Sequence, residues 1–315
     1  MNKRTLKRYA GNVFPGARAQ LNCHASILSL AFLVALLASP NLRAQGARDL
    51  WKVNADGGGL KLLAESPGYL SGSPDWSPDG KLIAYDTRKI GEGYPGTKIG
   101  IIRPDGKDRH LIGPGAMPSW SPDGKQLVAH TYDNPQTIVV MNADGTGREA
   151  IIKHWGSPRW SPRGNRVASL LDDGIALYDM ATGTETVIVR GPHPVHLGFA
   201  ISPDGKRFCF GGTDGGIYLA TLDEERMTSK VRPLANFGRS YHASFAPDGK
   251  RVVYSWGPDD AKPIQLYIRD VDADDDAKPI AGQDVTRDNM NPDWSPDGKT
   301  IVFVSQPRST AKDRL

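Results

Sequence analysis

The stretch SPDWSPDGKLIAY at residues 73–85 decides the fold, because five close copies of it follow along the chain. The copies read MPSWSPDGKQLVAH (117–130), SPRWSPRGNRVAS (157–169), GFAISPDGKRFCF (198–210), HASFAPDGKRVVY (242–254) and NPDWSPDGKTIVF (291–303). Their turn glycines lie 40 to 49 residues apart. A repeat of about 40–45 residues is typical of the four-stranded blade of a β-propeller.

Each copy predicts a β-hairpin. Proline presets the backbone at the first central position of a tight turn, and glycine accepts the left-handed conformation that other residues resist. Alternating apolar residues follow, as in Thr300-Ile301-Val302-Phe303. One large residue precedes each turn and is expected to pack against a neighbouring sheet: Trp76, Trp120, Trp160, Ile201, Phe245 and Trp294.

A second unit of alternating residues lies between the hairpins and brings each repeat to four strands. The sixth hairpin has no such unit after it, whereas one stands at the start of the repeat region, at 49–57 and 60–63. We therefore predict that this N-terminal segment pairs with residues 291–305. The expected fold is an all-β, six-bladed propeller over residues 45–306, in which this pairing closes the ring and removes exposed strand edges.

The repeated W-S-P-D-G-K, with V-M-N-A-D-G at 140–145, resembles the WD40-like Pro-Asp repeat of TolB-type propellers. The resemblance covers residues 45–306. It implies a periplasmic or extracellular propeller of the TolB-like class. TolB-type proteins carry an α/β domain ahead of the propeller, and this sequence has no room for one between the predicted leader and the first strand.

The first 44 residues have the layout of a secretory signal peptide. Basic residues come first, an apolar run at 27–38 follows, and small residues precede the expected cleavage after Ala44. The run is 12 residues long, and a membrane span needs about 20, so a retained anchor is the weaker alternative. We predict a periplasmic or secreted protein that is not integral to the membrane, with a short tail at 307–315.

Charge argues against a nucleic-acid partner. Residues 1–44 hold six of the 39 lysines and arginines and no acidic residue, so the remainder carries 33 basic and 35 acidic residues. A nucleic-acid-binding domain needs a basic excess, which the predicted mature chain lacks. Its one cysteine, Cys209, stands in an alternating strand and is expected in the core.

Candidate binding residues stand in the loops that lead into each innermost strand, where propellers present side chains at a channel mouth. These loops hold Tyr69, His154, Arg159, His193, His196, Tyr241, His242, Arg287, Asn289 and Asn291. His196 and His242, on adjacent blades, are candidates for a metal site near the channel. They are weak candidates, because the H-x-x-H spacing of His193 and His196 is not by itself a zinc signature.

The predicted function is binding rather than catalysis. The sequence contains no G-x-S-x-G nucleophile motif, and the acidic run at 272–276 lacks the pattern of a calcium loop. We expect no cofactor and a partner that is an envelope protein or a carbohydrate. The alternative is a carbohydrate-active lyase or hydrolase with a metal and histidines at the channel mouth, which would require several of the candidate side chains to converge.

Overall fold

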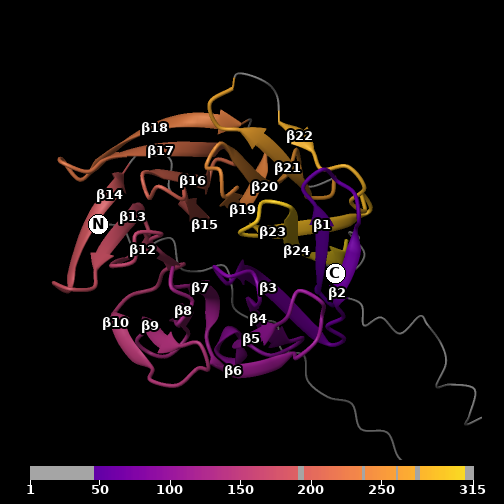
Figure 1. Cartoon of the computed structure of the whole chain (residues 1–315), viewed down its shortest axis with the longest axis horizontal. Helices are drawn as coiled ribbons and strands as arrows, with labels where there is room; N and C mark the ends of the chain where they lie inside the picture. The colour runs from indigo at the N-terminus through magenta and orange to yellow at the C-terminus, as the bar shows by residue number, and fades with distance from the viewer. Residues whose placement is uncertain (1–45, 191–194, 236–237, 260–261, 274–276, 309–315) are drawn as a thin grey trace, which may run out of the picture. The chain divides into compact units, whose positions relative to one another are not determined.

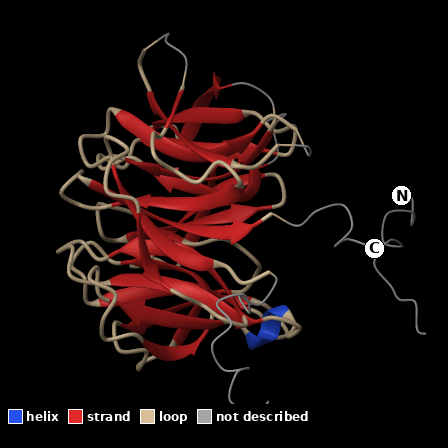
Figure 2. Cartoon of the chain, turned by 90° about the vertical axis from the view of Figure 1, so that its right-hand side faces the viewer, coloured by secondary structure: helices blue, strands red, loops and turns tan. Residues whose placement is uncertain are grey.

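The computed structural model describes residues 46–190, 195–235, 238–259, 262–273 and 277–308, without the side chains of 196, 197, 240 and 241. These residues form six four-stranded antiparallel sheets arranged as the blades of a propeller (Figure 1). The predicted fold class is confirmed. A 3-10 turn, η2 (Tyr94–Gly96), stands apart from the strands in Figure 2.

Each blade is named here by its order along the chain. Blade 1 holds β3 (Tyr69–Trp76), β4 (Ile83–Lys89), β5 (Lys98–Ile102) and β6 (His110–Pro114). Blade 2 holds β7 (Ala116–Trp120), β8 (Gln126–Thr131), β9 (Thr137–Asn142) and β10 (Glu149–Ile152). Blade 3 holds β11 (Arg159–Trp160), β12 (Arg166–Leu171), β13 (Gly174–Asp179) and β14 (Thr184–Arg190).

The remaining blades follow the same order. Blade 4 holds β15 (Val195–Ile201), β16 (Arg207–Gly212), β17 (Ile217–Asp223) and β18 (Thr228–Ala235). Blade 5 holds β19 (Arg239–Phe245), β20 (Arg251–Gly257), β21 (Gln265–Asp270) and β22 (Lys278–Pro279). Blade 6 joins the chain ends, with β23 (Arg287–Trp294), β24 (Thr300–Pro307), β1 (Asp49–Asn54) and β2 (Lys61–Ala64).

The predicted ring closure is present in blade 6. Strand β1 pairs with β24 in an unbroken antiparallel register from Asp49 opposite Ser305 to Asn54 opposite Thr300. Leu50 and Val53 of β1 are fully buried. The first and last parts of the propeller thus share one sheet, which leaves no inner strand unpaired at the junction.

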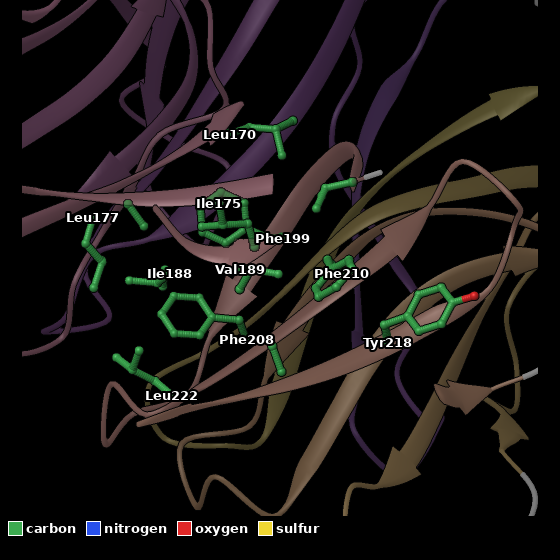
Figure 3. Packing of buried hydrophobic residues seen from close by; sticks show 13 residues of the cluster. Leu170, Ile175, Leu177, Ile188, Val189, Phe199, Phe208, Phe210, Tyr218 and Leu222 are labelled. Carbon is green, nitrogen blue, oxygen red and sulfur yellow. The ribbon is translucent and has the colours of Figure 1, made fainter. Parts of the chain in front are cut away.

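The core lies between the blades. Each of the six blade-to-blade interfaces has its own cluster of buried apolar side chains. Figure 3 shows the cluster between blades 3 and 4, where Leu170 and Ile175 face Phe199 and Phe208. The large residue before each turn packs into the interface with the preceding blade, as Trp120 does against blade 1. Cys209 is buried in the cluster between blades 4 and 5, as expected.

The Ser-Pro-Asp-Gly turns all lie at the same end of the channel, because each follows the innermost strand of its blade. In blade 1, the Ser77 hydroxyl donates to Asp79 Oδ1 at 2.8 Å, and the amide of Leu82 donates to the Ser77 hydroxyl oxygen at 2.9 Å. Gly80 has a φ of 69°, as the turn requires. We call this end of the channel the turn-side mouth and the opposite end, where the innermost strands begin, the loop-side mouth.

Candidate functional site at the two channel mouths

The turn-side mouth contains a cavity of about 380 Å³. All six blades contribute to its wall, so it lies on the propeller axis. Each blade supplies the proline of its turn and the large residue before it: Pro78, Pro122, Pro162, Pro203, Pro247 and Pro296, with Trp76, Trp120, Trp160, Ile201, Phe245 and Trp294. This wall is stiff, because proline fixes the backbone and the large side chains are anchored between blades.

The floor of this cavity is charged. Asp75, Arg159 and Asp293 stand one position before the large residue in blades 1, 3 and 6. The Arg159 guanidinium lies 3.2 Å from Asp75 Oδ1, and the two side chains are only 13% and 16% exposed. The Arg159 charge also acts electrostatically on Asp293, so one guanidinium influences two carboxylates. The floor carries a net charge of −1 when all three groups are ionised.

The same position links neighbouring blades. Asp75 Oδ2 accepts a hydrogen bond from the amide of Trp120 at 2.8 Å, and Asp293 Oδ2 accepts one from the amide of Trp76 at 2.8 Å. The hydroxyl oxygens of Ser119 and Ser244 likewise accept hydrogen bonds from the backbone amides of Trp160 and Trp294 in the next blades, each at 3.1 Å. Each floor carboxylate is thus fixed by a backbone donor on an adjacent blade, which preorganises it for binding.

Burial raises the pKa values of both carboxyl groups. Burial is the largest cause for Asp75, the nearby Asp293 adds to it, and Arg159 opposes both, so that the pKa of Asp75 reaches about 7. Burial likewise raises the pKa of Asp293 above its usual range. The charge of the floor therefore changes near neutral pH, because two carboxylates share one cation.

The loop-side mouth contains a smaller cavity of about 240 Å³. Its wall combines charged and aromatic side chains, among them Arg48, Asp86, Arg88, Tyr94 and Tyr132. Three wall residues occupy bulged positions of innermost strands with positive φ: Ser73 at 44°, Met117 at 53° and Asn291 at 52°. A bulge changes the direction in which a side chain leaves the sheet, and these three residues line the channel cavity.

Comparison with known proteins places the fold among characterised propellers. No protein-family model matches the chain. The chain is 29% identical over 240 residues to dipeptidyl-peptidase 5 of Porphyromonas endodontalis, over 68% of this chain and 34% of that protein. It spans a third to a half of the length of the curated relatives it matches.

The solved structure of TolB from Acinetobacter baumannii superimposes with a TM-score of 0.58 and 20% identity, over 84% of this chain and 64% of that one. The chain thus has the fold of a TolB-like six-bladed β-propeller. An oligogalacturonate lyase solved in complex with manganese has a TM-score of 0.51 at 15% identity, over 79% of this chain and 80% of that one. At these identities, the likeness of the TolB-like propeller to both structures concerns the fold alone.

The structure places the predicted site residues of the TolB-like propeller in different environments. Arg159 lines the turn-side cavity, whereas His242 and Asn291 line the loop-side cavity. Tyr69 is 41% exposed at the start of β3. These residues therefore do not form one cluster.

Three other predicted residues are held by contacts within the fold. His154 Nε2 lies 3.0 Å from Glu185 Oε1. Arg287 is buried and donates from Nε to the Ser305 hydroxyl at 2.8 Å. Asn289 is buried and donates from Nδ2 to the Asp284 carbonyl at 2.9 Å.

The remaining candidates lie where the structure gives no side-chain placement. His193 falls outside the described residues. The backbones of His196 and Tyr241 belong to β15 and β19, and their side chains lie outside the described part. A ligand or metal role for these three residues remains a prediction. Among the described residues, no three His, Cys, Asp or Glu side chains are grouped so that they could hold a metal ion.

The sequence analysis missed most of the residues that line the two cavities. Asp75 and Asp293 stand inside the quoted repeats, one position before a tryptophan, and that position is polar in five of the six copies. Aligning the copies at this position would have identified the floor. In the loop-side wall, Arg48, Asp86, Tyr94 and Tyr132 come from separate strands and loops with no shared spacing.

Replacing Asp75 with asparagine is expected to change how stability depends on pH. A carboxyl group whose pKa is raised on folding stabilises the protein at low pH, and this contribution is lost as the pH rises from about 4 to about 7. Asparagine resembles the protonated acid and keeps an acceptor for the Trp120 amide. We expect Asp75→Asn to match the wild type near pH 4 and to be more stable at pH 8 by up to about 4 kcal/mol.

Urea unfolding of both proteins at intervals from pH 4 to pH 8 measures this difference. Subtracting the two curves cancels carboxyl groups that both proteins share, such as Asp79, whose hydrogen bonds lower its pKa to about 2. A difference that stays constant across this range would contradict the assigned titration of Asp75.

Proposed function

We propose that this TolB-like propeller is a binding module of the cell envelope that captures an extended segment of a partner protein at its turn-side mouth. An envelope location is supported by the basic and apolar leader at residues 1–44. None of the described residues belongs to a helix long and apolar enough to cross a bilayer.

One observation carries the proposal, namely a stiff apolar wall around a charged floor. Binding sites in proteins are typically concave and mostly apolar, with a few fixed polar groups that orient the ligand. The turn-side cavity has this composition: prolines and large side chains surround Asp75, Arg159 and Asp293. Its volume of about 380 Å³ suits side chains from an extended segment rather than a folded domain.

The charge of the floor selects a basic side chain. Asp75 and Asp293 each retain acceptor capacity, because an ionised carboxylate has about four lone-pair sites and each makes few hydrogen bonds here. A second cation would neutralise the net charge of −1. Arginine suits this position best, because its planar fork pairs with a carboxylate through two parallel hydrogen bonds.

The floor also suits binding better than catalysis. Its polar atoms hold neighbouring blades together: the Ser244 hydroxyl donates to Asp293 Oδ1 at 2.8 Å and accepts from the Trp294 amide. Among the described residues that line this cavity there is no histidine, and the carboxylate that accepts from the Ser244 hydroxyl, Asp293, is itself held by the Trp76 amide. A floor held rigidly by these contacts, with acceptor sites left on its carboxylates, provides recognition by shape and charge.

Selection from a random peptide library on the immobilised protein tests this function. We expect the retained peptides to be enriched in arginine or lysine next to apolar residues. Asp75→Asn should weaken their binding at least about tenfold, because it removes the excess negative charge. Asp105→Asn, which changes an exposed turn of blade 1, is the matched control and should bind as the wild type does.

Two results would count against this role: retained peptides without basic residues, or retained peptides that bind Asp75→Asn as tightly as the wild type. The alternative of a metal-dependent lyase or hydrolase depends on His193 and His196, and it stays a prediction about residues outside the described part. Metal analysis of the purified protein, with His196→Ala beside it, addresses that alternative separately.

A further inference from the structure

The loop-side cavity is a second concave site that the proposed function does not use. Its wall comes from blades 1, 2, 5 and 6 together with Arg48, which precedes β1. Arg48 is held in place by its backbone: its amide donates to the Tyr69 carbonyl at 3.0 Å, and its carbonyl accepts from the Ser71 amide at 3.2 Å. The guanidinium is thus presented from a fixed position beside the innermost strand of blade 1.

The Arg48 side chain lines this cavity. Its Nε donates to Gln306 Oε1 at 3.0 Å, and its two terminal nitrogens make no hydrogen bond within the described part of the chain. Burial lowers the pKa of this guanidinium, which nevertheless stays charged at neutral pH. A half-buried guanidinium with two unused nitrogens is available to an acceptor on a ligand.

Two further charges lie in the same wall. Arg88 stacks over the Tyr94 ring, with its guanidinium carbon 4.5 Å from the ring centre. Asp86 accepts a hydrogen bond from the Met117 amide at 2.9 Å, and a Cβ built at Gly72 would lie 2.5 Å from Asp86 Oδ1. The glycine therefore leaves room for this carboxylate. Burial raises the pKa of Asp86, and the Met117 amide and the Arg48 charge oppose this rise. With Asp86 ionised, the three charges sum to +1, which a single monoanion neutralises.

Aromatic rings form the remaining side of the cavity. The centres of the Tyr94 and Tyr132 rings lie 5.2 Å apart. The ring centres of Tyr132 and His130 lie 4.6 Å apart, and the two ring planes are perpendicular. This buried histidine is neutral at physiological pH, because burial lowers its pKa to about 4. Tyr94 is 60% exposed at the rim. The exposed part of Tyr94 and the Tyr132 ring offer apolar contact to a ring-shaped body whose anionic group reaches Arg48.

We propose that the loop-side mouth is a binding site for a small monoanion in which a carboxylate is attached to a ring-bearing body. The carboxylate pairs with the free fork of Arg48, and the body lies along Tyr94 and Tyr132. A dianion such as a phosphate monoester fits less well, because its second charge would face Asp86. The cavity of about 240 Å³ limits the ligand to roughly one sugar or one amino-acid residue.

Isothermal titration calorimetry with two matched pairs of probes tests this site on the full chain. One pair is glucuronic acid and glucose, and the other is N-acetylphenylalanine and its amide. We expect at least one acid to bind at millimolar concentration or below, and its uncharged counterpart to bind at least about tenfold more weakly. The pair that responds identifies the body as a sugar or as a peptide end.

Variants separate recognition from damage to the fold. Arg48→Gln should weaken the acid at least about tenfold, whereas Arg103→Gln, on an exposed turn of blade 1, should leave it unchanged. Asp86→Asn keeps an acceptor for the Met117 amide and removes the opposing charge, so it should bind the acid about threefold tighter or better. A merely structural role of Asp86 would not produce tighter binding.

Three results would each overturn the inference. The first is that the neutral probes bind as strongly as the acids. The second is that neither acid binds at 10 mM, which is about ten times the expected limit. The third is that Arg48→Gln and Asp86→Asn both bind the acid with unchanged affinity. The turn-side variant Asp75→Asn should not alter binding of the acid at the loop-side mouth. This inference can therefore be refuted or supported independently of the function proposed above.

Discussion

Deleting residues 45–64 is expected to abolish folding of the propeller. The deletion removes β1 and β2, which form the outer half of blade 6, and leaves β24 with an unpaired edge along its whole length. It also removes Leu50 and Val53, which are fully buried in the two interfaces of that blade. The exposed edge and apolar surface should produce aggregation rather than a smaller propeller.

Point variants in β1 and β2 give the same test without changing chain length. Leu50→Ala should lower the free energy of unfolding by about 2–5 kcal/mol, because it leaves a cavity between blades 6 and 1. Lys61→Ala, at an exposed position of β2, should change it by less than about 0.5 kcal/mol. A deletion mutant that melts at the wild-type temperature would refute closure of the ring by this segment.

Arg159→Met is expected to be the most destabilising single change in the channel. Among the described residues that line this cavity, Arg159 is the only cation beside two buried carboxyl groups, and loss of one partner from a buried ion pair costs about 3–5 kcal/mol. The loss should be largest at pH 8 and smaller at pH 5, because protonation of Asp75 and Asp293 relieves the uncompensated charge. Urea unfolding at the two pH values measures it.

Arg163→Met provides the control for this change. Arg163 pairs with Glu224 at a partly exposed position on the turn of blade 3, so its replacement should cost about 1 kcal/mol or less at either pH. Equal losses in the free energy of unfolding for the two variants would contradict the assignment of Arg159 as the charge that compensates the two floor carboxylates. A loss in Arg159→Met that does not depend on pH would contradict it as well.

The architecture followed from the sequence because a propeller repeats a local unit. The tight turn, the alternating strand and the preceding large residue are all set within about a dozen positions, as in 73–85. Ring closure was predictable for the same reason: the strands missing after residue 305 have their counterpart at 49–63. Such reasoning needs no knowledge of how the blades lie around the axis.

The sites depend on that arrangement, and this is why sequence reasoning located them only in part. Arg159 was expected among the loops that lead into the innermost strands, yet it lies at the turn-side mouth with Asp75, 84 residues away. The bulges at Met117 and Asn291 turn side chains toward the channel at the other end. Both residues stand directly before a proline in their repeats, but the sequence analysis did not connect this pattern with a bulge.

The central claim is that the turn-side mouth binds a basic segment through a floor whose charge depends on Asp75. Calorimetric titration of one selected, N-acetylated arginine-containing peptide at pH 6 and pH 8 tests it most directly. We expect binding to be about tenfold tighter at pH 8, because Asp75 must give up its proton to receive the cation. Asp75→Asn should bind the peptide weakly at both pH values. Equal wild-type affinity at the two pH values, or full affinity in Asp75→Asn, would contradict the claim.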